Sequence, residues 1–161
     1  FQDIMPSSTL QSEIIMYLNY LLTQALGIED FRIYASESGN HLAKRVNYGL
    51  DLSVYDTRVL SSEKVNEKYA DVPPVLVVEV DVKVDTGNLT EDEFILKKTQ
   101  SLLDYGVEKV IWVISMNKKV LIAEKGKDWL VRDWQKEFEL MQGIRANIGA
   151  YLKKRGVPAG K

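Results

Sequence analysis

The sequence predicts a single mixed α/β (α+β) domain in which a central sheet is flanked by helices. Three observations indicate this class: a helical pattern near the start, a strand-like run from Val75 to Val84, and a second helical pattern followed by further strands. This order of helix, strands, helix, strands and helix is typical of layered folds. A length of 161 residues suits one domain with one sizeable core, so we assign residues 1–161 to a single domain.

The composition excludes several classes of protein. The absence of Cys rules out disulfides and thiolate metal sites, and leaves oxygen ligands and one His. A net charge of −2 argues against binding nucleic acid by bulk electrostatic attraction, but not against a metal nuclease, whose carboxylates are acidic until a cation binds. No apolar run of membrane-spanning length and no signal-peptide pattern occurs, so we expect a cytoplasmic protein that has no membrane partner.

The first helical pattern begins after Ser7 and Ser8. Apolar residues recur at steps of three and four from Leu10 to Leu26, which predicts an amphipathic helix that ends at Gly27. Glu13 belongs to the polar side of this helix. We expect Glu13 to face solvent, and recruitment of its carboxylate to a site is the alternative.

A short strand and a turn follow. The residues from Phe31 to Ala35 alternate as in a strand, and those from Ser36 to Asn40 are rich in Ser, Gly and Asn, which predicts a turn. His41, the single histidine, comes directly after that turn. A metal or acid/base role is open to it, but a lone loop histidine is more often a surface residue.

The segment from Val46 to Asp56 predicts the next strand. Its apolar residues fall on one face, and Gly49, Asp51 and Ser53 fall on the other. Aspartate is disfavoured inside strands, so Asp51 is a candidate functional carboxylate. Gly49 beside it allows a backbone or a ligand to approach closely.

The run from Val75 to Val84 carries ionisable side chains at alternate positions. Because strand side chains alternate between faces, Glu79, Asp81 and Lys83 should share one face and the aliphatic residues the other. Charges on a buried strand cost on the order of several kcal/mol unless they are paired or hold a metal. A solvated edge strand is the alternative interpretation.

The second helix is predicted to begin at Thr90 and to end before Gly106. At about 100° per residue from Phe94, Lys98 falls at roughly 40°, inside the apolar arc, and Lys97 falls at roughly 300°, outside it. We therefore expect Lys98 to face the sheet and Lys97 to face solvent.

The last third of the chain predicts strands at Val107 to Ser115, Val120 to Glu124 and Trp129 to Trp134. The stretch from Glu137 to Arg155 reads as wholly or partly helical. Trp129 and Trp134 suit either the core or an oligomer surface, and aromatic residues in a strand are more often core.

One constellation can carry chemistry: Asp51 on one strand, Glu79 on the next, and Lys98 on the following helix. Adjacent strands lie about 4.8 Å apart, so two carboxylates on one face can bind a hard cation such as Mg²⁺ or Mn²⁺. A lysine above them can orient or deprotonate a water and stabilise charge at a phosphate. The pattern indicates metal-assisted phosphodiester hydrolysis, and an ion pair that only satisfies itself is the alternative.

The motifs that carry these residues are GLDLSVYD, PPVLVVEV and KKTQSLLDYGVEKVIWVI. From about Leu10 to Glu124 the chain resembles the Uma-two family of the PD-(D/E)XK nuclease superfamily. The resemblance implies a restriction-endonuclease-like fold and a DNA endonuclease. It implies Asp51 and Glu79 as Mg²⁺ ligands and Lys98 as the catalytic lysine that activates water.

The chain departs from that family pattern at four positions. Leu50 stands where the family usually has Pro, and Leu102 where it often has Tyr. Asp81 occupies the usual strand position of the lysine, where it is a third metal ligand or disrupts the site, and Lys83 rivals Lys98 as the catalytic lysine. A nuclease fold without cleavage, which binds nucleic acid or acts in regulation or interaction, is therefore the alternative function. For an active enzyme we expect a homodimer, since two sites cut two strands.

Overall fold

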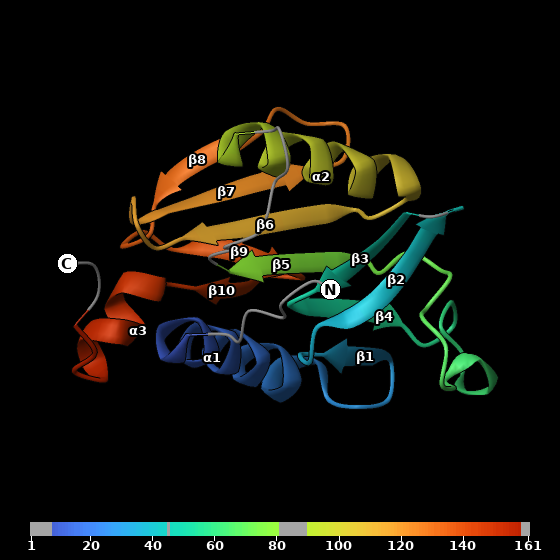
Figure 1. Ribbon diagram of the computed structural model, residues 1–161. Coiled ribbons are helices and arrows are strands. Elements are labelled where there is room, and N and C mark those ends of the chain that lie inside the picture. The colour runs from blue at the N-terminus through green and yellow to red at the C-terminus, as the bar shows by residue number, and fades with distance from the viewer. Residues whose placement is uncertain (1–7, 45, 81–89, 159–161) are drawn as a thin grey trace.

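The computed structural model describes residues 8–44, 46–80 and 90–158. Its centre is a six-stranded mixed sheet (Figure 1) in which only the β5/β6 pair is parallel. In spatial order its strands are β1 (Phe31–Tyr34), β4 (Leu52–Asp56), β5 (Leu76–Val80), β6 (Lys109–Ile114), β7 (Lys119–Glu124) and β8 (Leu130–Asp133). This sheet, with helices on both sides, confirms the predicted mixed α+β class.

Two hydrophobic cores lie on the two faces of this sheet. One face carries α1 (Thr9–Leu26), α3 (Ile148–Lys154) and the hairpin of β9 (Phe138–Met141) and β10 (Ile144–Ala146). The other face carries α2 (Glu91–Tyr105) and the hairpin of β2 (Ser38–Ala43) and β3 (Val46–Leu50). Leu18 and Val78 belong to the first core, and Val77 and Leu102 belong to the second. The sheet is thus covered on both sides, and its central strands are buried.

The two long helices begin and end at the predicted residues. The Ser8 side chain accepts a hydrogen bond from the Gln11 N–H at the start of α1. Thr90 and Glu93 form a reciprocal capping box at the start of α2. Gly106 ends α2 with φ of 126°, where a Cβ would lie 3.1 Å from the Pro73 ring, so glycine is required there. No helix in the described ranges has an apolar stretch that could cross a membrane.

The alternation predicted for the central strand is confirmed as far as the structure describes it. Leu76, Val78 and Val80 pack in the core beneath α1, whereas Val77 packs toward α2. The predicted continuation of this strand to Val84, which includes Asp81 and Lys83, lies outside the described residues.

The predicted turn at Ser36 to Asn40 is wrong from Ser38 onward, because β2 begins there. The Asn40 side chain is fully buried, donates a hydrogen bond to the Tyr105 hydroxyl at 2.9 Å and accepts one from the Tyr55 hydroxyl. These partners make a buried strand position favourable for a residue type that usually marks turns. His41 consequently lies on a strand and not in a loop.

The single strand predicted from Val46 to Asp56 is two strands. β3 pairs with β2 in the hairpin, whereas β4 pairs with β1 and β5 in the main sheet. The chain passes from one sheet to the other at Asp51.

The stretch from Glu137 to Arg155 is partly helical, as one of the two predicted alternatives has it: α3 forms its last part, and β9 and β10 form its first part. Gln142 and Gly143, with φ of 48° and 77°, form the tight turn of the β9/β10 hairpin. Buried Phe138 and Leu140 flank an exposed glutamate, which is strand periodicity. Trp134 is only 1% exposed, which places it in the core and not on a surface.

Candidate functional site

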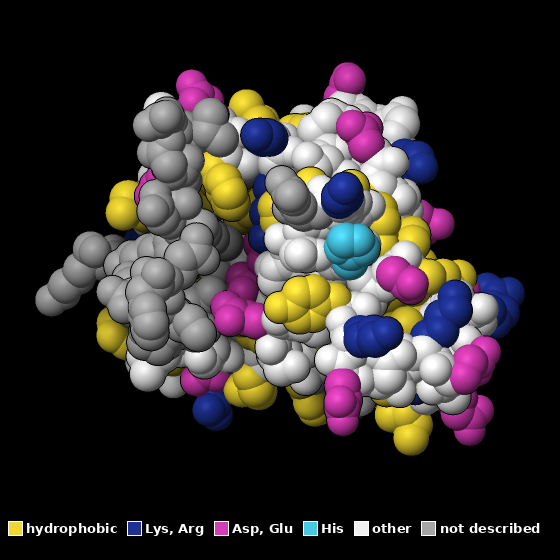
Figure 2. Space-filling model, turned by 45° about the vertical axis from the view of Figure 1, so that its right-hand side comes forward, with side chains coloured by type: hydrophobic (Ala, Val, Ile, Leu, Met, Phe, Trp, Pro, Cys, Tyr) yellow, Lys and Arg dark blue, Asp and Glu magenta, His cyan; other side chains and the backbone are white. Residues whose placement is uncertain are grey.

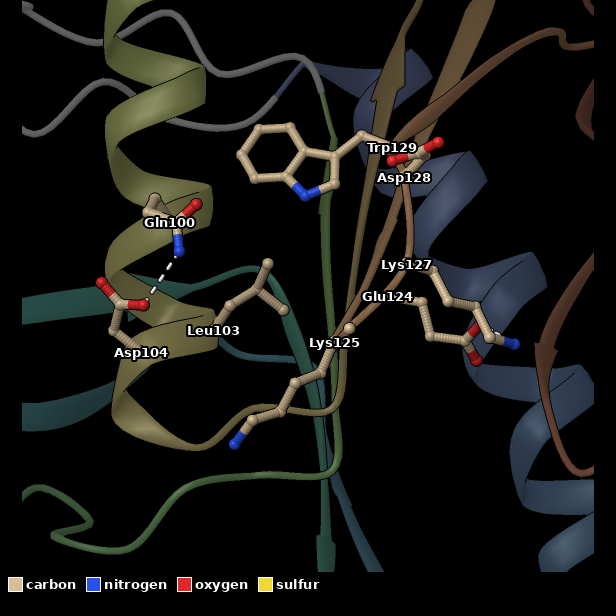
Figure 3. Close-up of a pocket in the computed structure, with 9 residues that line it drawn as sticks. Gln100, Leu103, Asp104, Glu124, Lys125, Lys127, Asp128 and Trp129 are labelled. Atoms are coloured by element: carbon tan, nitrogen blue, oxygen red, sulfur yellow. Dashed lines mark hydrogen bonds and ion pairs between the residues drawn. The ribbon is translucent and has the colours of Figure 1, made fainter.

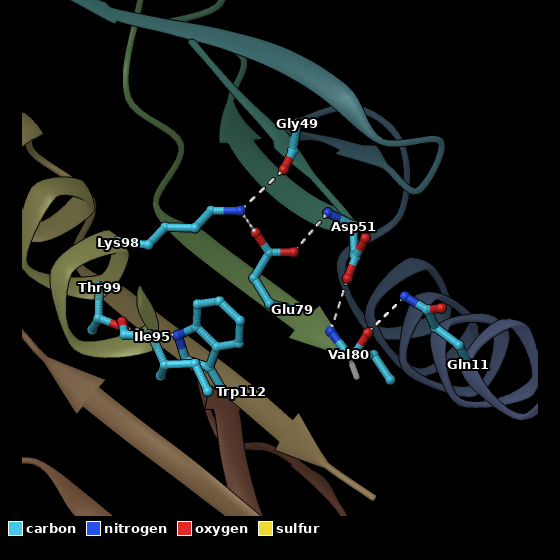
Figure 4. Close-up of polar contacts among 9 residues, drawn as sticks. All are labelled: Gln11, Gly49, Asp51, Glu79, Val80, Ile95, Lys98, Thr99 and Trp112. Carbon is cyan, nitrogen blue, oxygen red and sulfur yellow. Dashed lines mark hydrogen bonds and ion pairs between the residues drawn. The ribbon is translucent and has the colours of Figure 1, made fainter. Parts of the chain in front are cut away.

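The predicted constellation of Asp51, Glu79 and Lys98 comes together where β3 and β4 separate, near the end of β5 and beneath α2 (Figure 4). The three side chains belong to residues that are 5%, 1% and 5% exposed, respectively. Ionisable residues are rarely buried to this degree unless they are paired. The cluster is therefore a built feature of the second core and not a chance surface pairing.

The strand register explains why the two carboxylates meet. Leu52 of β4 is paired with Val78 of β5, so Asp51 and Glu79 stand one step further along the same antiparallel pair. At this step the peptide N–H of Asp51 donates to Glu79 Oε2 at 3.1 Å, and the N–H of Val80 donates to Asp51 Oδ2 at 2.9 Å. At this step the side-chain carboxylates of Asp51 and Glu79 accept the hydrogen bonds that backbone carbonyls accept elsewhere in the strand pair. The backbone pairing therefore ends here, and the chain turns away into β3.

The Lys98 ammonium lies among four groups. It forms an ion pair with Glu79 Oε1 and donates a hydrogen bond to the Gly49 carbonyl at 3.2 Å. The ring centroids of Tyr48 and Trp112 lie 5.1 Å and 5.7 Å from its Nζ, within the range of cation–π attraction. These contacts hold the ammonium of a long side chain inside the core, with partners besides Glu79.

Among the three clustered residues, Glu79 has the pKa that its surroundings clearly shift. Burial raises the pKa of the Glu79 carboxyl from 4.5 to about 7, with the Lys98 ammonium opposing this rise and the Asp51 carboxylate adding to it. A carboxyl group whose pKa lies near neutrality beside a second carboxylate is typical of functional sites, although structural ion pairs also shift pKa values.

The two carboxylates fit a hard divalent cation. Apart from the Lys98 ammonium, Glu79 Oε1 has no hydrogen-bond partner among the described residues, so this buried oxygen retains coordinating capacity. Mg²⁺ is commonly held by one or two carboxylates and several waters. Within ranges 8–44, 46–80 and 90–158, no group of three or more His, Asp or Glu is placed to hold a metal. The third expected ligand, Asp81, lies outside those ranges.

Of the remaining site candidates, the two that the structure describes, Glu13 and His41, are not part of the cluster. Glu13 accepts a hydrogen bond from the Tyr151 hydroxyl at 2.7 Å and lies 3.8 Å from the Arg155 guanidinium, so its carboxylate joins α1 to α3. His41 is exposed, and its Nδ1 lies 2.6 Å from the Asn47 side-chain oxygen across the hairpin. Lys83, like Asp81, is outside the described residues.

Sequence reasoning missed three residues that hold the site. Tyr48 and Trp112 contribute the rings around Lys98, and Gln11 donates from α1 to the Val80 carbonyl at 2.6 Å. Trp112 stands opposite Glu79 in the parallel β5/β6 pairing. Knowledge of which β6 residue pairs with Glu79 would have placed this tryptophan beside the site.

The surface around the hairpin is mixed in charge. Figure 2 shows acidic and basic side chains interspersed over the face that carries the histidine. A separate hollow of about 560 Å³ lies between α2 and the β7/β8 connection (Figure 3), and none of the three clustered residues lines it. Lys127 forms an ion pair with Glu124 at 2.7 Å in its wall, and the Gln100 amide donates a hydrogen bond to the Asp104 carboxylate at 2.8 Å. The hollow therefore offers no comparable group of buried ionisable side chains.

Comparisons with known proteins show the fold. No protein-family model and no curated protein matches the chain. A crystal structure from Anabaena variabilis ATCC 29413, described as "a putative nuclease belonging to DUF820", is similar with a TM-score of 0.74 at 13% identity, over 95% of this chain and 85% of that chain. The likeness supports a nuclease-like fold. Membership of the Uma-two family stays a prediction.

The raised pKa of Glu79 predicts a pH-dependent stability. The folded chain keeps this proton where the unfolded chain has lost it, so the added stability is complete below about pH 4.5 and is lost as the pH rises through about 7. We expect the unfolding free energy of the wild type to fall relative to Glu79→Gln by on the order of 1–3 kcal/mol between about pH 5 and pH 8. Urea unfolding across this range measures the difference, and a constant or rising difference would contradict the prediction.

The ion pair predicts a double-mutant result. Above about pH 7, where Glu79 is ionised in the wild type, Lys98→Met removes the counter-charge of a buried carboxylate and should destabilise the fold by about 3–5 kcal/mol. Glu79→Gln combined with Lys98→Met removes both charges and should be less destabilised than Lys98→Met alone. Exposed Lys97 supplies the control, because Lys97→Met should change stability by less than about 0.5 kcal/mol. Urea denaturation decides, and a double variant no more stable than Lys98→Met would rule out the charge argument.

Proposed function

We propose that the chain is a metal-dependent nuclease that hydrolyses DNA phosphodiester bonds. The observation that carries this proposal is the buried cluster of two carboxylates and one lysine at the end of β5. Such a cluster adds little net stability compared with a well-packed apolar group, which favours a functional reason for it. The nuclease-like fold adds support.

Each residue has a distinct role in the proposal. Asp51 and Glu79 hold Mg²⁺ or Mn²⁺ through the carboxylate oxygens that their backbone partners leave free. When bound, such a cation polarises a phosphoryl oxygen and lowers the pKa of a coordinated water. Lys98 donates its ammonium protons toward the negative charge that develops on the phosphate, and it orients the attacking water.

The expected partners follow from this chemistry. With acidic and basic side chains interspersed on the face of Figure 2, we infer that contacts near the site and not a broad basic surface direct the DNA backbone. Two copies of the chain, related by a two-fold axis, would place one site on each strand of a duplex. A homodimer is therefore part of the proposal.

A second candidate is a nuclease fold that binds nucleic acid or a regulatory partner without cleavage. The observation in its favour is that Lys98 already neutralises Glu79 through a direct ion pair. A pair that satisfies itself is the expected arrangement in a site that no longer takes part in chemistry.

Cleavage of supercoiled plasmid DNA separates the two candidates. With Mg²⁺ or Mn²⁺ present, the wild type should nick or linearise the plasmid, and chelation of the cation should stop it. Asp51→Asn, Glu79→Gln and Lys98→Met should each lose at least about 100-fold in rate, because each removes a cation ligand or the lysine that acts on water and phosphate. Lys97→Met, one residue away on the exposed side of α2, should retain the wild-type rate.

Two other results would count against cleavage at this cluster. A wild type that retards DNA in gel-shift experiments but never cleaves it supports the inactive module. Cleavage that persists in Glu79→Gln at the wild-type rate excludes this cluster as the catalytic site.

A further inference from the structure

We propose that the Lys98 ammonium is a resident counter-ion of Glu79 that a divalent cation must displace, so that lysine and cation compete for one carboxylate. This inference rests on the proposed function in taking Asp51 and Glu79 as the cation ligands. It adds that Lys98 weakens cation binding even though it serves the reaction.

The lysine and the cation compete because one oxygen of each carboxylate already accepts a backbone hydrogen bond. Glu79 Oε2 accepts from the Asp51 N–H, and Asp51 Oδ2 accepts from the Val80 N–H. Glu79 Oε1 accepts no hydrogen bond from the described backbone, and it is the atom that the Lys98 ammonium contacts. An ammonium and a divalent cation on one buried oxygen would repel strongly, because little water lies between them to screen their charges. Binding of the cation therefore requires the ammonium to withdraw.

The Lys98 ammonium already has partners besides Glu79, and we take them as its resting place when the ion pair opens. The Gly49 carbonyl accepts one of its protons at 3.2 Å, and the rings of Tyr48 and Trp112 lie 5.1 Å and 5.7 Å away. A carbonyl and two aromatic faces hold a cation without needing a carboxylate. Lys98 can thus leave Glu79 and still remain beside the site.

The Trp112 ring is itself held in place. Its Nε1–H donates to the Thr99 hydroxyl at 2.8 Å, and that hydroxyl donates to the Ile95 carbonyl at 2.6 Å. Because Thr99 follows Lys98 on α2, the helix that carries the lysine also fixes the ring that faces its ammonium. The resting place is preorganised and does not have to be built when a cation binds.

The competition predicts opposite effects on binding and on cleavage. Removing Lys98 removes the competitor, so the cation should bind more tightly, although the proposed reaction is lost. A lysine that only stabilised the fold would give equal or weaker cation binding when removed. The affinity for Mn²⁺ alone is therefore a readout that does not depend on activity.

The test is calorimetric titration with Mn²⁺, without DNA, in alkaline buffer that keeps carboxyl groups ionised. We expect Lys98→Met to bind Mn²⁺ about tenfold more tightly than the wild type, within the usual range of coupling between two ligands. Lys98→Gln, which keeps a polar side chain, serves as a second variant in case Lys98→Met folds poorly. Lys97→Met is the matched control and should bind as the wild type does.

Equal or weaker Mn²⁺ binding in both folded Lys98 variants overturns the competition and leaves the proposed metal site standing. Absence of Mn²⁺ binding in the wild type and in every folded variant overturns the metal site itself, and this inference with it.

Tyr48 tests the resting place independently. Tyr48→Leu removes one aromatic face and should weaken Mn²⁺ binding about threefold or more, while Tyr48→Phe keeps the face and should bind as the wild type does. Tyr20→Leu, on the exposed side of α1, is the control. Unchanged binding in Tyr48→Leu would show that the displaced ammonium does not rest on that ring.

Discussion

The site contains two buried carboxylates beside a buried ammonium. The positions of the strands and the helix around the site depend on partners being found for these three charges. Unpaired charges in a core are strongly unfavourable, so each must find partners. Asp51 and Glu79 find theirs in backbone N–H groups and in Lys98. For this to happen, the β4/β5 pairing must stop at Leu52 and α2 must present its buried side above the sheet.

The β2/β3 hairpin contributes contacts to the buried ammonium. It supplies Lys98 with the Gly49 carbonyl and the Tyr48 ring. Buried Asn40 joins the same hairpin to the hydroxyl of Tyr105 on α2, and to that of a tyrosine on β4. The base of the hairpin is therefore tied to the helix that carries the lysine, so the hairpin contacts of Lys98 are held relative to α2.

The sequence was sufficient to find the three clustered residues, because each is a charged residue at a position where its predicted element disfavours charge. Glu79 lies in an otherwise aliphatic run, Asp51 is a residue type disfavoured in a predicted strand, and Lys98 lies within the apolar arc of a helix. The separation of β3 from β4 could not be predicted, because the alternation is continuous through Asp51 and the break depends on hydrogen bonds to a distant strand. Tyr48 was missed for a similar reason, since only the folded chain brings its ring to the lysine.

The wrong predictions elsewhere concern residues whose usual secondary-structure preference is overridden by their contacts in the fold, or whose sequence pattern was misread. Asn40 was assigned to a turn by its type, and its buried partners place it in a strand. Gly143 lies within the stretch predicted as wholly or partly helical, but with Gln142 it makes the turn of a hairpin, and the alternation around Leu140 is the signal for a strand. None of these errors moves the candidate site, which depends on the central strands and α2.

The central claim is that Asp51 and Glu79 together form a divalent cation site. A crystal of the wild type soaked in Mn²⁺ and measured for anomalous scattering tests this most directly. We expect a strong anomalous peak within coordination distance of both carboxylates, with the Lys98 ammonium moved away from Glu79 toward the Gly49 carbonyl. A well-ordered cluster that shows no peak, with Lys98 still on Glu79 at saturating Mn²⁺, would show that Asp51 and Glu79 do not form a divalent cation site.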